Sequence, residues 1–141
     1  MRAPQVLLAV AVLAFAGFLV SPGFVDSIKG DGTVTMLPGF AAVAWQTLTV
    51  RSAVTHSARE ALVVPLLPAH AAFVILPLVV AMGRFRQRAL RYTFCVIFVC
   101  GLSSMAWTIW SFERVAFGVY LWLLAAVAAG SFCLLPGSYD T

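Results

Sequence analysis

The stretch that decides the fold is residues 61–112, ALVVPLLPAHAAFVILPLVVAM–GRFRQRALR–YTFCVIFVCGLSSMAWTIWSF. Its first and last parts, residues 61–82 and 92–112, contain no Asp, Glu, Lys or Arg. A helix of about 21 residues rises roughly 32 Å, enough to cross a hydrocarbon core of about 30 Å. We therefore predict two transmembrane helices over these residues, joined by an arginine-rich loop at 83–91.

Two further apolar segments extend this pattern. Residues 115–135 contain no charged side chain, and residues 3–22 are apolar after Gln5. The N-terminal segment also resembles a signal peptide, because Arg2 precedes an apolar run and Ala14-Phe15-Ala16 could be a cleavage site. We interpret it as a retained helix, since the apolar run is long for a signal sequence.

The composition supports a membrane protein. Of the 141 residues, 62% are hydrophobic and only 10% are charged, whereas soluble domains carry about 25% charged residues. A chain this short has too little interior to hide so much apolar surface from water. We predict an all-α integral membrane protein, residues 1–141 forming one four-helix transmembrane bundle.

Basic and aromatic residues predict the orientation. The positive-inside rule places the arginine-rich loop in the cytoplasm, and both termini with it. Tryptophan and tyrosine favour the membrane interface, and five of them then lie in the outer half. These are Trp45, Trp107, Trp110, Tyr120 and Trp122. Eight Arg against one Lys, with abundant Ala, Val and Gly, are typical of a GC-rich genome. We expect a bacterial cytoplasmic membrane.

The segment 23–60 is the main extracytoplasmic part. Residues 24–36 contain two β-prone runs around Lys29-Gly30-Asp31-Gly32, which predicts a small β-hairpin. Residues 37–54 then follow a helical period, which predicts an interfacial amphipathic helix. Residues 36–50 could instead form a re-entrant segment or a short fifth span. The apolar side of the amphipathic helix is a candidate partner-binding surface, made by Phe40, Trp45 and Leu48.

His70 is the candidate ligand-binding residue, because it is the only histidine inside a predicted span. Counted from residue 61 it lies roughly 13 Å deep, near the midplane. Ser103 and Ser104 of the next helix fall at a similar depth, so these three could bind a ligand together. The plainer interpretation is that His70 hydrogen-bonds to these serines and holds two helices together. Pro65, Pro68 and Pro77 could kink the helix and open a polar cavity beside it.

The remaining residue patterns limit the classes of function that the sequence supports. No charge run suits nucleic acid, and His70 with Cys100 is too small a ligand set for a metal site. We expect no bound cofactor and no catalysis.

The arginine loop could bind anionic lipid as well as set topology, through Arg84, Arg86, Arg88 and Arg91. We predict an accessory or stabilising subunit of a larger membrane complex, with the lipid bilayer and other membrane subunits as partners. The alternatives are a small-molecule binding or transport component, and a membrane enzyme acting on lipid or a redox cofactor.

Overall fold

The computed structural model describes residues 3–28, 34–44, 64–111 and 116–135. Within them the chain is mostly helical, and three helices are long and apolar enough to cross a membrane. A fourth apolar helix, of 16 residues, is shorter. The elements in chain order are α1 (Ala3–Val20), β1 (Pro22–Ile28), β2 (Val34–Pro38), α4 (Leu66–Ala81), η1 (Arg84–Arg86), α5 (Arg88–Ser111) and α6 (Phe117–Leu134).

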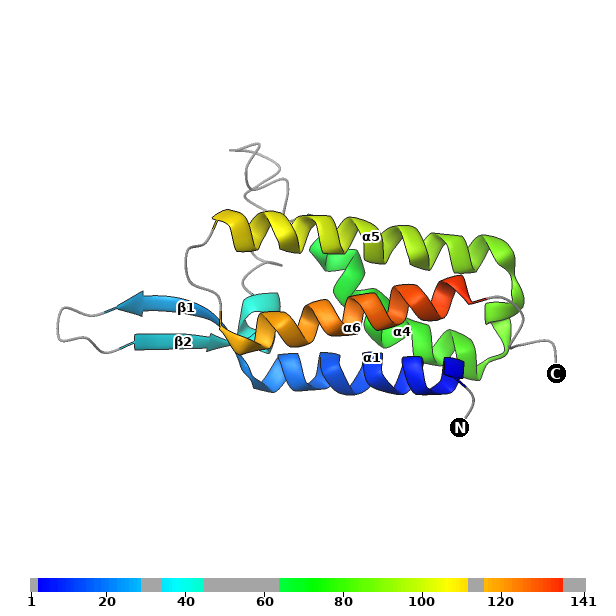
Figure 1. Ribbon diagram of the computed structural model, residues 1–141, viewed down its shortest axis with the longest axis horizontal. Helices are drawn as coiled ribbons and strands as arrows, with labels where there is room; N and C mark the ends of the chain where they lie inside the picture. The colour runs from blue at the N-terminus through cyan, green and yellow to red at the C-terminus, as the bar shows by residue number, and fades with distance from the viewer. Residues whose placement is uncertain (1–2, 29–33, 45–63, 112–115, 136–141) are drawn as a thin grey trace.

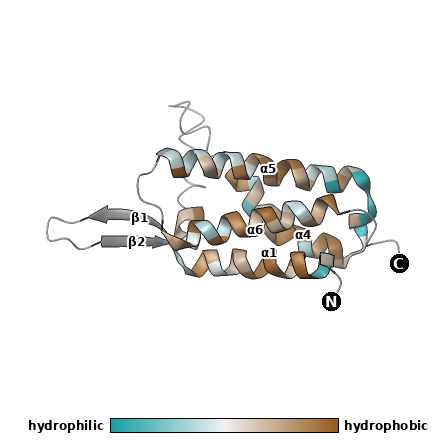
Figure 2. Ribbon diagram, viewed as in Figure 1, coloured by the Kyte–Doolittle hydropathy of each residue, from teal (hydrophilic) through white to brown (hydrophobic). Residues whose placement is uncertain are grey.

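The helices run roughly side by side, and α6 packs between α1 and α5 (Figure 1). α4 packs against α5 and α1. The two strands extend from one end of the helices, which we call the hairpin end. The start of α1, the end of α6 and the turn η1 lie together at the opposite end, which we call the arginine end. Figure 2 shows hydrophobic residues along the helices and hydrophilic residues gathered at the arginine end.

Helix α4 begins later than the sequence predicts, at Leu66 rather than at residue 61. Pro65 is its N-cap residue and Pro68 its third residue, where the missing N–H would have no helical partner in any case. These two prolines therefore mark the start of the helix instead of kinking it, and only Pro77 lies in its interior. At about 1.5 Å per residue α4 spans roughly 24 Å. It begins part-way along the bundle and ends at the arginine end (Figure 1).

The arginine-rich connection is shorter than predicted. Gly83 adopts a left-handed conformation with φ 67°, η1 follows, and α5 begins at Arg88 rather than at residue 92. The sequence Arg88-Ala89-Leu90-Arg91 consists of strong helix formers, so the helix extends through it. Two of the four arginines of this connection, Arg88 and Arg91, therefore belong to α5.

The hairpin is attached closely to the helix ends. β1 and β2 pair antiparallel, with Val25 opposite Met36. The Gly39 N–H donates to the Ser21 carbonyl at 3.0 Å, and a Cβ on Gly39 would lie 2.1 Å from the Phe18 carbonyl oxygen. Only glycine fits there. Residues 39–44 are helical, and the remainder of the predicted amphipathic helix, with Trp45 and Leu48, lies outside the described residues.

Small residues let α6 occupy the centre of the helical part. Ala125, Ala126 and Ala129 are fully buried, so neighbouring helices approach the α6 backbone closely. The largest fully buried side chains come from α1, α4, α5, α6 and η1: Phe18, Leu66, Leu76, Phe85, Phe98, Met105, Val119, Trp122 and Phe132. The apolar core is thus continuous from the hairpin end to the arginine end.

Candidate functional site

His70 lies in the interior, where helices α1, α4 and α6 meet. Its side chain is 5% exposed. The imidazole centroid lies 6.0 Å from that of Phe15, 6.1 Å from that of Phe18 and 5.8 Å from that of Trp122. The Phe18 ring is stacked on the imidazole, and the Trp122 ring meets it edge-on. His70 is therefore enclosed by aromatic rings from two other helices.

Three polar atoms of this enclosure have no hydrogen-bond partner within the described part of the chain. They are Nδ1 and Nε2 of His70 and Nε1 of Trp122. The Leu66 carbonyl, one turn earlier in α4, interacts with the imidazole but without hydrogen-bond geometry. A buried polar group without a partner costs about 1–3 kcal/mol. Such groups are uncommon in folded proteins, so a cluster of three calls for an explanation.

The serines predicted to face His70 do not bond to it. Ser103 is exposed, and its Oγ donates to the Val99 carbonyl of its own helix at 3.0 Å. Ser104 is buried, but neither imidazole nitrogen accepts from it or donates to it. The predicted hydrogen bond between helices is therefore wrong for the described residues. The reason is the rotation of α5, which turns Gly101 towards α4 and Ser103 away from it.

Gly101 is a site residue that sequence reasoning missed. A Cβ at this position would lie 2.7 Å from the Ala69 Cβ and 3.2 Å from Cη2 of Trp122. The absence of a side chain lets α4 and α5 approach next to His70, and lets the indole reach between them. A glycine opposite an alanine in two adjacent spans is the signal that could have indicated this contact.

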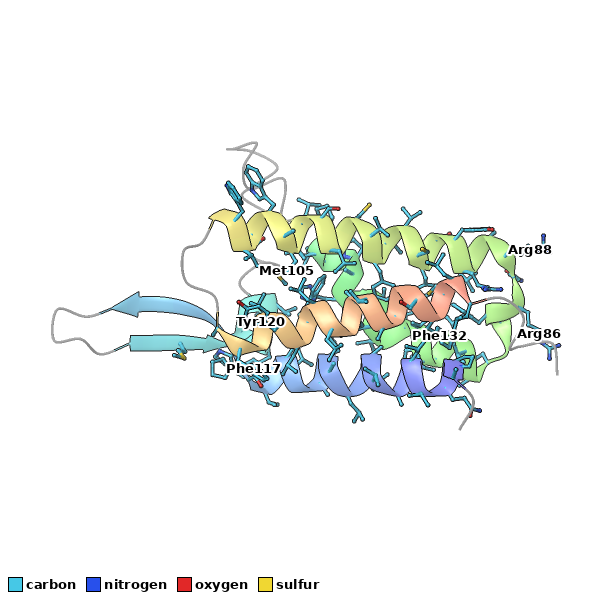
Figure 3. All side chains as sticks on the ribbon, viewed as in Figure 1. Arg86, Arg88, Met105, Phe117, Tyr120 and Phe132 are labelled. Carbon is cyan, nitrogen blue, oxygen red and sulfur yellow. The ribbon has the colours of Figure 1, made fainter. Side chains whose placement is uncertain are left out.

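Trp122 was predicted to lie in the interfacial aromatic belt, but it is fully buried. It shares a helix face with Ala125 and Ala129, which are also fully buried, and this periodicity marks the inward side of α6. Other aromatic residues towards the hairpin end are exposed, and Figure 3 labels two of them, Phe117 and Tyr120. The exposed set is Phe40, Trp107, Trp110, Phe117 and Tyr120.

The position of His70 along the helices follows from its aromatic neighbours. Its neighbour Trp122 lies five residues into α6, and Phe18 lies two residues from the end of α1. At about 1.5 Å per residue this corresponds to roughly 8 Å from the hairpin end of α6. His70 therefore lies beside the first half of α6, between the hairpin end of that helix and its middle.

The arginine end contains a second polar arrangement. The Arg91 guanidinium donates to the Cys133 carbonyl through Nε at 3.2 Å and through an Nη at 3.1 Å. The same Nη donates to the Leu135 carbonyl. Arg91 therefore satisfies two carbonyls at the end of α6. This differs from the prediction, in which Arg91 is available to bind lipid together with the other three arginines. Arg84, Arg86 and Arg88 are exposed. Figure 3 labels Arg86 and Arg88 at the arginine end.

The described residues include no group of three or more His, Cys, Asp or Glu side chains placed to hold a metal ion. No protein-family model matches the chain, and neither a curated protein nor a solved structure shows significant similarity to it. Inferences about function therefore depend on the geometry of this molecule.

Proposed function

We propose that this protein is a non-catalytic accessory subunit that stabilises a larger membrane complex, with helix α5 as its contact in the bilayer. The observation that carries this proposal is the outward face of α5. This helix is the least apolar of the three long ones, yet much of it is uncovered. Its exposed side chains include small and weakly polar ones as well as aromatics: Thr93, Cys100, Ser103, Ala106, Trp107 and Trp110.

Helix α5 also exposes Val96 and Val99, but the outward face of α1 is more uniformly apolar. It exposes branched aliphatic side chains, among them Val12, Leu13 and Val20, and Leu13 is 71% exposed. Such side chains suit lipid tails. Small residues on a membrane helix instead allow another helix to approach closely, as on α5 at Cys100, Ser103 and Ala106. The proposed partner is therefore a transmembrane helix of another subunit, lying along α5.

The hairpin end supplies a second contact in this proposal. Phe40 is 61% exposed immediately after β2, at the start of the helical residues 39–44. Trp45 and Leu48 remain proposed partner-binding residues by their sequence pattern. We further propose a four-helix arrangement in a bacterial cytoplasmic membrane, with the arginine end and both termini in the cytoplasm. The location of η1 at the same end as the start of α1 and the end of α6 is consistent with this orientation.

The test is mild extraction of the tagged chain from its native membrane, followed by mass spectrometry of intact complexes. Ser103→Phe adds bulk to the outward face of α5, and Ala16→Phe adds the same bulk to the exposed face of α1. We expect Ser103→Phe to release the partner and Ala16→Phe to retain it. A wild-type chain recovered alone at native abundance, or two variants that behave alike, would contradict the proposal.

A second candidate function, small-molecule binding, rests on the three unpaired polar atoms around His70. Neutral imidazole offers one donor and one acceptor, and the indole N–H offers one more donor. A compact neutral guest with an acceptor oxygen, such as a carbonyl compound, would pair with both side chains between the aromatic rings. The test is mass spectrometry of small molecules released from the purified wild type and from His70→Leu. Recovery of one compound from the wild type alone supports binding, and identical extracts exclude it.

A further inference from the structure

The turn between α4 and α5 is held rigidly against the end of the bundle. Gly83 reverses the chain with its positive φ, and Phe85 inserts into the core at 1% exposure. The Phe85 ring lies 5.2 Å from the Phe132 ring and 6.1 Å from the Phe94 ring, measured between centroids. Because the middle side chain of η1 points inward, its two neighbours point outward. Arg84 and Arg86 are accordingly exposed on either side of the buried ring.

Among the described residues, no acid lies near this turn in the sequence. The sequence contains no Asp or Glu between residues 64 and 111 or between residues 116 and 135. Within the described part of the chain, Arg84, Arg86 and Arg88 make no ion pair. Arg88 is also the first residue of α5, where a cation is unfavourable to the dipole of its own helix. Arg91 shares that disadvantage but gains the carbonyls of α6 in return. Within the described residues, Arg88 makes no hydrogen bond to another helix that would offset this cost.

We propose that Arg84, Arg86 and Arg88 together bind the anionic headgroup of a phospholipid in the leaflet at the arginine end. Guanidinium groups donate two parallel hydrogen bonds to a phosphate and remain charged at any physiological pH. Met82 and Tyr92, on either side of the turn, are 61% and 67% exposed. The site thus combines a cationic turn with adjacent apolar surface, which suits a molecule with a charged head and an acyl tail better than a free anion. Arg91 is left out of this site, because its Nε and one Nη donate to carbonyls at the end of α6 and hold the guanidinium there.

The test is native mass spectrometry of the detergent-solubilised protein, titrated with phosphatidylglycerol or with phosphatidylcholine of the same acyl chains. The triple variant Arg84→Gln, Arg86→Gln and Arg88→Gln removes the site. The control Arg51→Gln, Arg59→Gln and Arg114→Gln removes the same number of charges elsewhere. A basic residue near an anionic membrane strengthens binding about fivefold, so three should contribute on the order of a hundredfold.

We expect the wild type and the control to prefer phosphatidylglycerol, and the triple variant to lose that preference at an unchanged melting temperature. Equal loss in the control would show a general charge effect and overturn the site. Full competition by inorganic phosphate at concentrations similar to those of the lipid would also overturn it, because the apolar part of the ligand would then contribute nothing. These results are independent of whether a protein partner binds α5.

Discussion

Arg91 and His70 are both polar residues of apolar helices, but they differ in their hydrogen-bond partners. Arg91 makes three hydrogen bonds to the carbonyls of Cys133 and Leu135. His70, at 5% exposure, makes none through either ring nitrogen within the described residues. The difference follows from position along the helices. The last carbonyls of a helix have no partner in the helix itself, whereas those in the middle are already bonded.

The two ends of the helical part therefore differ in the hydrogen-bond acceptors that they offer to a polar side chain. At the arginine end the backbone of α6 supplies acceptors, and a cation also interacts favourably with the negative end of its dipole. Around His70 only another side chain, a water molecule or a guest could pair with the imidazole, and the described neighbours are aromatic rings and small residues. The first arrangement stabilises the end of α6, whereas the second leaves polar atoms of His70 and Trp122 without a partner among the described residues.

The largest effect is expected from closing the space beside His70. Gly101→Ala places a Cβ at 2.7 Å from the Ala69 Cβ, which pushes α4 and α5 apart. We expect a loss of about 2–3 kcal/mol in unfolding free energy, measured by denaturation in mixed micelles. Gly130→Ala is the matched control, since a Cβ there has nothing within 4 Å. It should be neutral or slightly stabilising because alanine favours helix. Equal stability of the two variants would refute the close contact.

A smaller loss is expected from removing the bonds at the arginine end. Arg91→Leu leaves the carbonyls of Cys133 and Leu135 without donors, at a cost of about 2 kcal/mol in unfolding free energy. The exposed residue Arg88 provides the control, and Arg88→Leu should change the same quantity by less than about 0.5 kcal/mol. If Arg91→Leu were as stable as the wild type, the capping of α6 would be energetically unimportant, and the contrast with His70 would disappear.

The smallest effect on stability is expected at His70 itself. His70→Leu replaces an unpaired polar ring with an apolar side chain of similar volume, so the empty protein should be unchanged or about 1 kcal/mol more stable. The measurement is the melting temperature in detergent after extensive exchange to remove bound molecules. A clear drop in that temperature would mean that the imidazole has a partner even in the stripped protein. A drop seen only before exchange would indicate a guest.

Several features of this protein could be predicted from particular residues. The absence of charge over residues 92–112 and 115–135 predicted two helices that the structure contains as α5 and α6, with ends shifted by a few residues. The start of α4 could not be predicted in the same way. Pro65 and Pro68 are compatible with a kinked helix or with a helix start. Which of the two forms depends on whether the residues before them provide helical carbonyl acceptors for the N–H groups that follow.

The candidate site was less predictable than the helices. His70 was identified from its residue type alone, since an ionisable group in an apolar span is uncommon. Its neighbours were not, because Ser103 and Gly101 are only two residues apart in sequence yet face opposite ways on α5. A rotation of α5 about its axis decides which of them meets α4, and no local pattern in the sequence specifies that rotation.

The sequence by itself determined that this chain has helices able to enter a membrane, because lipid imposes one strong requirement, a long run of apolar residues. It also concentrated the positive charge between two of those runs. Only the tertiary structure decided that Arg91 caps α6 while three other arginines stay exposed, and that Trp122 closes over His70 instead of facing the interface. Such choices depend on the rotation and depth of each helix. Those are set by contacts between side chains far apart in the sequence, and by the few places, such as Gly101, where two backbones can approach.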